Sequence, residues 1–390
     1  MKTETISQKQ TLEHEVHPFA VQLSEITVKC TECGLCVDEC AFLKKYGTPK
    51  KIVTGYNPEN NEIGIIPYEC SLCGLCSAVC PEGLDIRGLF MNMRRELAKR
   101  GIAPLRKHKA LLQHEKTGMS RLFTFYALPE GCKELLFPGC AFAGTRPGLT
   151  RKLFHLLEDV IPGIGIALDC CGRISDDLGF QEFSHSMLSE IQDYLISHGV
   201  EDVIVVCPNC YGMFRKYADG LNVRMVYEVL PDVPCMERLH NKTYVIHDPC
   251  SMRNCSGLHE RIRQLLSTAA VSFKDMAHTG EKTLCCGNGA GVKYICPEFA
   301  ETWLDKTAIE TSGGSVVTYC AGCVEMMETR MNCTHVLDVL LNPEKPSVYG
   351  LMSKPPFTYV HRLLLKRYFR KTVSAVSVME RSYKTIKNRI

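Results

Sequence analysis

Two cysteine-rich stretches decide how this chain folds: residues 30–40 read CTECGLCVDEC, and residues 70–81 read CSLCGLCSAVCP. Each stretch has the spacing C-x2-C-x2-C-x3-C, which places four thiols within eleven residues. Such close spacing is typical of the ligands of a [4Fe–4S] cluster. Zinc is the alternative, but zinc ribbons separate two C-x2-C pairs by a longer insert. The spacing therefore indicates a small iron–sulfur module.

The order of the cysteines also predicts which of them share a cluster. In two-cluster ferredoxins the fourth cysteine of each run binds the other cluster. We therefore expect one cubane [4Fe–4S] cluster on Cys30, Cys33, Cys36 and Cys80, and a second on Cys40, Cys70, Cys73 and Cys76. Pro81 follows the second run whereas Ala41 follows the first, a change that loosens the turn without removing a ligand.

A second cysteine pattern occurs twice between residues 140 and 323, and such internal repeats reveal architecture. Each copy reads C…CCG…C-x2-C and offers five thiols, one more than a cubane cluster needs. The two sets are Cys140, Cys170, Cys171, Cys207 and Cys210, and Cys250, Cys285, Cys286, Cys320 and Cys323. A glycine follows the two adjacent cysteines of each copy, Gly172 in the first and Gly287 in the second. It lets the backbone turn tightly and approach a cluster.

Short apolar segments precede these cysteines and alternate with helical stretches. The apolar segments are 135–137, 166–168, 203–206, 244–246, 283–284 and 315–319, and the helical stretches are 148–159, 181–198, 259–267 and 299–311. This alternation is typical of buried parallel strands with crossover helices. Ligands of open α/β sheets bind outside the carboxyl ends of the strands. We therefore expect two small α/β units, each with its five cysteines at that end of its sheet.

Together, these features resemble the CCG-domain family of iron–sulfur proteins. In their order they resemble the D subunit of heterodisulfide reductase, in which a ferredoxin-like C subunit and a CCG-bearing B subunit are fused. Similar chains serve as iron–sulfur subunits of glycolate oxidase and lactate-utilisation systems, and as the C subunit of anaerobic glycerol-3-phosphate dehydrogenase. The resemblance covers roughly residues 24–340, and its local motifs are FPGC at 137–140, CPNCY at 207–211, HDPC at 247–250 and CCGNGAG at 285–291.

The resemblance implies that each repeat holds a noncubane [4Fe–4S] cluster with its five cysteines, and that the pair cleaves or forms a disulfide in one-electron steps. Disulfide cleavage needs two electrons, so two clusters beside one pocket could each hold a substrate sulfur until both electrons arrive. The alternatives are sites that only relay electrons, or a metal-free disulfide between the adjacent cysteines.

The expected protein is thus an oxidoreductase subunit that passes electrons through two cubane clusters to two noncubane clusters. Its alternative is a non-catalytic electron-transfer subunit that links a flavin dehydrogenase to quinone. The expected partner is a redox protein: a flavoprotein, a ferredoxin or a membrane cytochrome subunit. The direction of electron flow and the disulfide stay open.

Several residues near the motifs have two interpretations. Five cysteines are not used as ligands: Cys132, Cys235, Cys255, Cys296 and Cys333. Free cysteine is commonly a small buried hydrophobe, and the alternative for Cys255 and Cys296, which lie near the second CCG motif, is a redox partner of that site or a residue that supports its ligands. His247 and Asp248 either assist proton transfer to sulfur or form an ordinary turn before Pro249. Arg253, Arg261 and Arg263 either pair an acidic substrate or belong to a solvated helix face.

The fold class we expect is α+β overall, with a helical two-cluster ferredoxin module followed by two repeated α/β domains. The expected division is 1–23, a polar N-terminal segment; 24–100, the ferredoxin domain, closed by a helix at 86–99; 101–131, a connector without a chemical motif; 132–240 and 241–345, the two CCG domains; and 346–390, a basic amphipathic tail.

Composition excludes several classes of protein. The chain has 390 residues, 45% of them apolar, which is enough for two or three compact domains. Its net charge is only +3, so nothing indicates nucleic acid as a partner. It has neither an apolar run of about 18 residues nor a signal-peptide core. We expect a cytoplasmic protein in a reducing, anaerobic setting, because its cysteines are spaced for metal.

The C-terminal segment differs from the rest in charge. Residues 351–390 carry ten Lys or Arg and one Glu. Aromatic and aliphatic residues alternate with these cations, as in an interfacial amphipathic helix. One hypothesis is peripheral contact with the inner face of the cell membrane, and the other is a helix that packs on an acidic neighbour.

Overall fold

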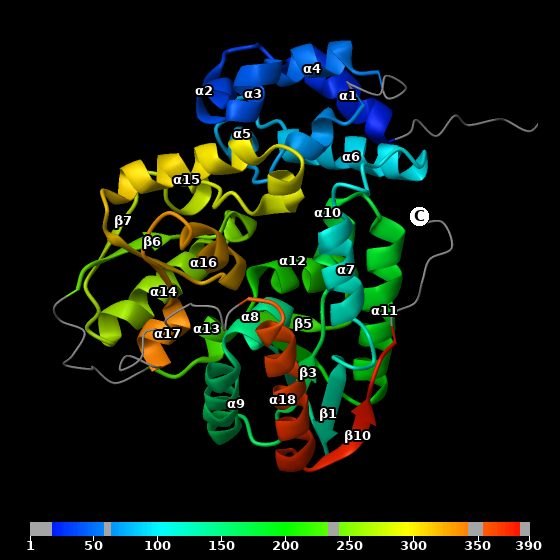
Figure 1. Ribbon diagram of the computed structural model, residues 1–390, viewed down its shortest axis with the longest axis vertical. Coiled ribbons are helices and arrows are strands. Elements are labelled where there is room, and N and C mark those ends of the chain that lie inside the picture. Colours follow the sequence, from blue (N-terminus) through cyan, green and yellow to red (C-terminus); the bar gives the residue numbers. More distant parts are fainter. Residues whose placement is uncertain (1–17, 58–63, 233–241, 342–353, 383–390) are drawn as a thin grey trace, which may run out of the picture.

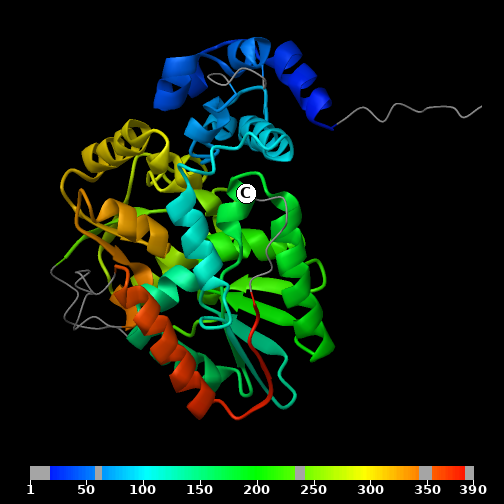
Figure 2. The same cartoon turned by 45° about the vertical axis from the view of Figure 1, so that its right-hand side comes forward.

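The computed structural model describes residues 18–57, 64–232, 242–341 and 354–382. A helical N-terminal module lies at one end of the molecule, above two α/β units that lie side by side (Figure 1). The view of Figure 2 shows the C-terminal helix returning to the first of these units. The architecture is thus α+β, as the sequence predicts.

The N-terminal module consists of short helices around the two cysteine runs. They are α1 (Pro18–Lys29), α2 (Leu35–Glu39), α3 (Ala41–Tyr46), α4 (Pro49–Gly55), the 3₁₀ helix η1 (Ile66–Glu69), α5 (Leu75–Ala78) and α6 (Ile86–Lys99). The two runs share one backbone geometry, because Gly34 and Gly74 adopt φ of +86° and +78° just before α2 and α5. Only glycine takes this conformation without strain, and it turns the chain around the thiols.

The first α/β unit is built on a six-stranded sheet of order β10-β1-β3-β2-β4-β5. Four strands are parallel: β2 (Glu134–Phe137), β3 (Gly165–Leu168), β4 (Asp202–Val205) and β5 (Asn222–Met225). Two antiparallel strands complete the edge, β1 (Phe125–Pro129) and β10 (Ala375–Met379). The helices are α7 (Lys109–Gly118), α8 (Cys140–Thr145), α9 (Pro147–Val160), α10 (Arg173–Asp177), α11 (Gln181–Ser197), α12 (Pro208–Tyr217) and α13 (Val226–Val229).

The second α/β unit repeats the parallel part of the first. Its sheet has the order β7-β6-β8-β9, with β6 (Tyr244–His247), β7 (Phe273–Asp275), β8 (Ser315–Thr318) and β9 (Cys333–His335) all parallel. In chain order this is the topology of β3-β2-β4-β5. The helical elements are η3 (Cys250–Met252), α14 (Ser256–Thr268), η4 (Gly280–Lys282), η5 (Gly289–Tyr294), α15 (Pro297–Thr311), α16 (Ala321–Met327) and α17 (Val336–Leu341).

The predicted helices match α6, α9, α11, α14 and α15, but one predicted strand is wrong. Residues 283–284 form no strand, and the strand β7 that corresponds to β3 lies earlier in the chain. Side-chain hydrogen bonds hold this segment in place of the main-chain hydrogen bonds of a β-sheet. The Thr283 hydroxyl donates to the Asp248 carbonyl at 2.7 Å, and His247 Nε2 donates to the Leu284 carbonyl at 3.2 Å.

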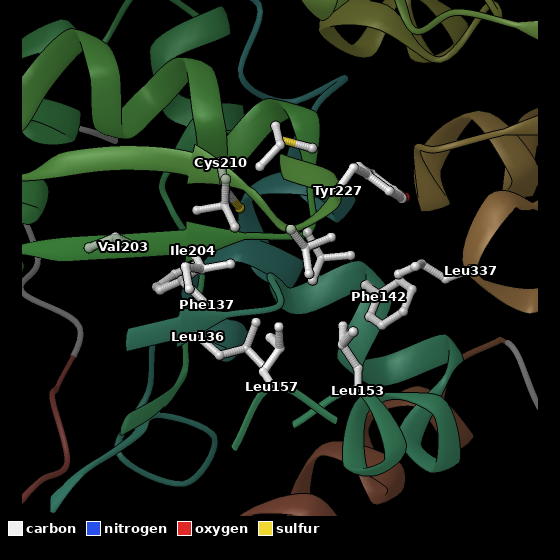
Figure 3. Packing of buried hydrophobic residues seen from close by; sticks show 14 of the residues in the cluster. Leu136, Phe137, Phe142, Leu153, Leu157, Val203, Ile204, Cys210, Tyr227 and Leu337 are labelled. Carbon is white, nitrogen blue, oxygen red and sulfur yellow. The ribbon is translucent and has the colours of Figure 1, made fainter. Parts of the chain in front are cut away.

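One apolar core runs through both α/β units. It contains Phe137 and Ile204 of the first sheet, Phe142 and Tyr227 between the units, and Leu337 of the second unit (Figure 3). A second core lies under the N-terminal module and includes side chains of α15 and η5. The module therefore packs directly on the second α/β unit.

The C-terminal segment belongs to the first unit. Helix α18 (Phe357–Thr372) contacts α8 and α9, and β10 pairs with β1. Leu365 and Phe369 of α18 are almost completely buried. The apolar face of the tail is thus largely used in the fold. Among the described helices, none has the length and apolar character to cross a membrane.

Candidate metal centres

The four cysteines of each predicted ferredoxin set surround one hollow. Cys30, Cys33, Cys36 and Cys80 line a hollow of about 350 Å³, counting the part open to solvent. Cys40, Cys70, Cys73 and Cys76 line a second hollow of about 460 Å³. The structure thus brings together the thiols that the sequence pairs. Across the described residues, no group of three or more His, Cys, Asp or Glu side chains is arranged to hold a single metal ion.

The chemistry of these thiols fits a cationic group between them. Burial raises the pKa of Cys36 to about 11, and the neighbouring Cys30 and Cys33 add to the shift. Burial likewise raises the pKa of Cys40 to about 12, with Cys73 and Cys70 contributing. Crowded, buried thiols resist ionisation on their own, whereas a bound metal deprotonates them outright. The two sets are therefore suited to ligate iron.

The first α/β unit gathers the first set of five cysteines at the carboxyl end of its sheet. Cys140 and Cys170 lie with their sulfurs 3.8 Å apart. Hydrogen bonds to Cys171 and Cys207 raise the pKa of Cys210 well above its ordinary value. Cys207 lies within electrostatic range of Cys140, so the five thiols form one group.

The second α/β unit gathers the second set in the same way. Hydrogen bonds link Cys285 to Cys250 and to Cys286, and raise the pKa of Cys285 well above its ordinary value. Cys323 in turn hydrogen-bonds Cys286 and Cys320. The repeat in the sequence is thus a repeat of the site.

Helix N-termini point at both five-cysteine groups. Cys207 is the N-cap of α12, and Cys320 is the N-cap of α16. Pro208 starts α12, where its missing N–H costs nothing. The partial positive charge of a helix N-terminus favours a thiolate over a thiol. This placement suits cysteines that ligate a metal or carry reducing equivalents.

Three residues beside the first five-cysteine group were not predicted. His114, on α7, hydrogen-bonds Cys140, which raises the pKa of His114. The Tyr359 hydroxyl lies 2.8 Å from His114 Nδ1. Arg362 is only 2% exposed and donates to the Gly118 carbonyl at 2.9 Å. Neither the 101–131 segment nor the tail has a motif that would indicate this contribution.

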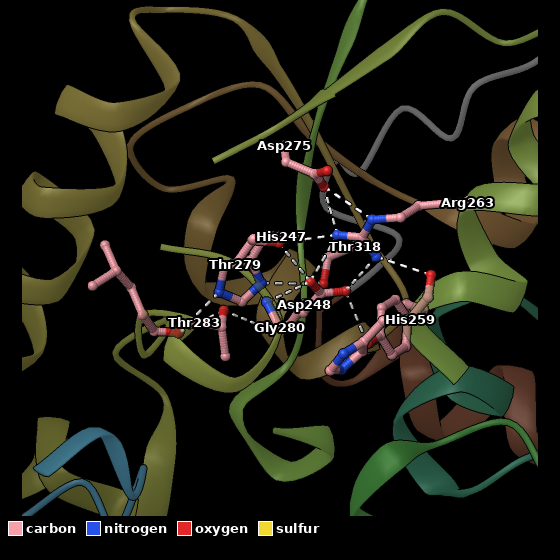
Figure 4. Close-up of polar contacts among 11 residues, drawn as sticks. His247, Asp248, His259, Arg263, Asp275, Thr279, Gly280, Thr283 and Thr318 are labelled. Carbon is pink, nitrogen blue, oxygen red and sulfur yellow. Dashed lines mark hydrogen bonds and ion pairs between the residues drawn. The ribbon is translucent and has the colours of Figure 1, made fainter. Parts of the chain in front are cut away.

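His247 and Asp248 lie in an internal network of hydrogen bonds rather than in an open site (Figure 4). Asp248 accepts from Arg263 and Thr279 at 2.9 Å and from the Tyr319 hydroxyl at 3.1 Å. Burial alone would raise the pKa of Asp248, but the hydrogen bond and charge of Arg263 outweigh it and lower the pKa to about 2. The partners belong to other elements of the second unit, so this segment is held by a buried tertiary network rather than by a local turn.

The three arginines also make internal contacts. Arg253 donates to the main-chain carbonyls of Cys73 and Thr283, and Arg261 donates to those of Tyr227 and Leu230. Arg263 pairs with Asp248 and Asp275. They form neither a solvated helix face nor an open anion site.

The left-over cysteines behave as apolar residues. Cys132, Cys296 and Cys333 are buried in three different cores. Cys255 is half-buried against the first core. Cys235 lies outside the described residues.

The four cysteine groups lie in series. Cys76 lies within electrostatic range of Cys36 of the other ferredoxin set. A hydrogen bond with Cys285 lowers the pKa of Cys73 to about 6. Tyr227 lies within electrostatic range of both Cys320 and Cys207 and is stacked edge-on against Tyr319. The series runs from the ferredoxin module through the second α/β unit to the first.

Comparisons with known proteins agree with this organisation. A model of the 4Fe-4S dicluster domain matches residues 29–85, and a model of the cysteine-rich CCG domain matches residues 135–215 and 244–328. The D subunit of the heterodisulfide reductase of Methanosarcina mazei is 24% identical over 78% of this chain and 88% of its own length. The B subunit of the fumarate reductase (CoM/CoB) of Methanothermobacter marburgensis is 26% identical over 75% of this chain and 66% of its own length.

Two further matches are more limited. The EtfAB:quinone oxidoreductase of Syntrophomonas wolfei is 23% identical over 63% of this chain and 38% of its own length. The solved structure of Picrophilus torridus aspartate racemase covers 54% of this chain and 90% of its own chain at 11% identity, but its TM-score of 0.27 is too low to indicate a shared fold. The domain models and the heterodisulfide reductase relatives together place this chain in the family of CCG-domain iron–sulfur proteins that resemble the D subunit of heterodisulfide reductase.

Proposed function

We propose that this chain is an iron–sulfur oxidoreductase subunit that passes electrons from two cubane clusters to two noncubane clusters, and that the noncubane pair reduces or forms a disulfide. The burial of Cys73 and Cys285 in one apolar cluster carries the proposal, because it joins the ferredoxin module to the second CCG site. Electrons that reach the second ferredoxin site then have a direct exit toward the CCG pair.

The proposed ligands are the four cysteine groups of the structure. The first cubane takes Cys30, Cys33, Cys36 and Cys80, and the second takes Cys40, Cys70, Cys73 and Cys76. The first CCG site takes Cys140, Cys170, Cys171, Cys207 and Cys210, and the second takes Cys250, Cys285, Cys286, Cys320 and Cys323. Bound there, iron–sulfur clusters supply one-electron storage and transfer.

Two one-electron sites suit disulfide chemistry. Reduction of a disulfide takes two electrons and two protons and yields two thiols. The two CCG sites come near each other at Tyr227, which lies within electrostatic range of Cys207 in the first and Cys320 in the second. The methanogen relatives support this chemistry, because they are named as reductases of a heterodisulfide. The proposed electron donor is a redox protein: a flavoprotein, a ferredoxin or a membrane cytochrome subunit.

The alternative is a non-catalytic subunit that links a flavin dehydrogenase to quinone. One surface feature favours it: an open groove lined by five cations and one acid. The cations are Arg121, Lys366, Arg367, Arg370 and Lys371, and Glu380 pairs with the first, second and fourth of them. Leu122 and Leu364 are exposed on the same elements. A basic surface with apolar side chains suits peripheral contact with an anionic membrane, where quinone is found. The similarity to an EtfAB:quinone oxidoreductase points the same way.

The deciding experiment is an iron and acid-labile sulfide count on anaerobically purified protein. Four four-iron clusters predict about sixteen of each per chain. About eight, in fully loaded protein, would leave only the ferredoxin module with metal and would refute the proposed CCG reaction centre. If the count is about sixteen, a disulfide-reductase assay with an artificial donor separates the two functions. Inactivity toward a broad panel of disulfides would then favour the quinone-linked subunit.

A further inference from the structure

The two ferredoxin sites have very different surroundings. The first site lies at the surface, with Cys33 exposed, whereas Cys70 and Cys73 of the second site are buried. The lining of the first hollow includes Glu32 and Glu82 and, among the described residues, no Arg or Lys. The second hollow lies instead among three arginines, and this difference in charge is the basis of the inference.

Two of these arginines are buried beside the ligands. Arg94 is 0% exposed and donates to the Cys70 carbonyl at 2.6 Å. Arg253 is 7% exposed and donates to the Cys73 carbonyl from Nε and Nη2, at 3.2 and 3.1 Å. The third, Arg87, lines the second hollow itself and is half-buried.

The two buried guanidinium groups have no carboxylate as a hydrogen-bond partner in the described part of the chain. Arg94 donates to the carbonyls of Pro67, Cys70, Asp177 and Ala290. Arg253 donates to the carbonyls of Cys73, Glu281 and Thr283. Burial of a cation without a counter-charge is costly. A four-iron cluster on four thiolates carries net negative charge and supplies a counter-charge beside both guanidinium groups, so the residues fit this group.

The acidic residues near the second hollow are already paired. Glu69 lines the hollow and bonds Lys45 at 3.2 Å and the Tyr46 hydroxyl at 2.6 Å. Glu39, next to Cys40, bonds Lys306 at 3.2 Å. The arginines therefore leave the second site with a net positive environment.

We propose that Arg87, Arg94 and Arg253 give the second ferredoxin site a higher reduction potential than the first, so that electrons enter beside Cys33 and run inward. Added positive charge favours the reduced, more negative state of a cluster. A reduced one-electron protein donor loses an electron to the first site, the first site loses it to the second, and the second passes it across the Cys73–Cys285 contact. The inference rests on the proposed ligand sets and gives the CCG pair the direction of disulfide reduction.

The test is a potentiometric titration of the full-length, anaerobically loaded protein, followed by electron paramagnetic resonance. The native protein should show two cubane signals with separate midpoint potentials. We expect Arg87→Gln to lower the higher potential and leave the lower one unchanged. The matched control is Arg100→Gln, which removes one charge at the end of the same helix, about 20 Å along its axis. It should move neither signal.

A second pair of variants distinguishes the effect of the Arg253 charge from a structural effect of replacing its side chain. Arg253→Gln should lower the same potential as Arg87→Gln, whereas Arg253→Lys, which keeps the charge, should retain most of the native value. The inference is overturned if the lower-potential signal moves, if neither moves, if Arg100→Gln acts as Arg87→Gln does, or if both Arg253 variants act alike. Failure of the proposed function looks different. If the CCG sites lack iron, or if no disulfide is turned over, the order of the two cubane potentials is unaffected. Loss of a cubane signal from fully loaded native protein would refute the ligand sets and this inference together.

Discussion

Replacement of Phe369 by Ala tests whether the C-terminal helix is part of the core or a surface anchor. Phe369 is 0% exposed, and its ring packs against the Phe154 ring with a centroid distance of 5.1 Å and an interplanar angle of 68°. Truncation of a fully buried Phe to Ala costs about 3–5 kcal/mol, since transfer and cavity terms add. The upper part of this range is expected where the site cannot collapse, and α18 is held by α8 and α9 and by strands β1 and β3.

The matched control is Leu364→Ala on the same helix. Leu364 is 57% exposed, so its truncation should change stability by no more than about 0.5 kcal/mol. Urea unfolding followed by far-UV circular dichroism measures both variants, in anaerobic buffer to preserve the thiols. Because the chain has several cores, the comparison uses the shift of the transition that contains the first α/β unit rather than one global free energy. Equal, small shifts for the two variants would refute the packing of α18.

The remaining predictions concern the metal sites, the contact between the units and the surface. Cys171→Ser should lower the iron content by about four atoms per chain, whereas Cys132→Ser should leave it unchanged; an equal loss would contradict the ligand set. Asp338→Asn should cost about 3 kcal/mol in urea unfolding, because it removes the counter-charge of buried Arg146 at 2.9 Å, and adding Arg146→Met should restore much of the loss. A double variant as unstable as the single one would contradict this account. Lys371→Glu should weaken flotation with anionic vesicles and not with neutral ones, and unchanged flotation would argue against the membrane contact.

The cysteine sites could be predicted because their information is local. The spacing of the cysteines indicates which thiols meet, and the CCG repeats place their cysteines after short strands or at helix starts such as Cys207 and Cys320. The same local logic failed at residues 283–284. An apolar pair before a cysteine resembles the end of a strand, but tertiary hydrogen bonds to Asp248 and from His247 hold this segment as a loop.

The C-terminal segment was ambiguous for a physical reason. An amphipathic helix that packs on its own domain and one that lies on a membrane share the same alternation of apolar and basic residues. Only the tertiary structure shows that Leu365 and Phe369 are buried while Leu364 is exposed. The pairing of β10 with β1 could not be predicted from the sequence either, because neither strand belongs to the internal repeat.

The order of the four sites also depends on contacts that no local pattern contains. Cys73 and Cys285 are 212 residues apart in the chain, yet they are buried in the same apolar cluster. Arg94 is one of several basic residues in α6, and only its complete burial against the Cys70 carbonyl distinguishes it. The motifs thus indicate how many cysteine groups the chain can build, whereas the packing of the module on the second α/β unit determines how these groups are arranged. A variant that loosens this packing but keeps all eighteen proposed ligands should therefore retain its iron and lose electron transfer from the ferredoxin module to the CCG pair.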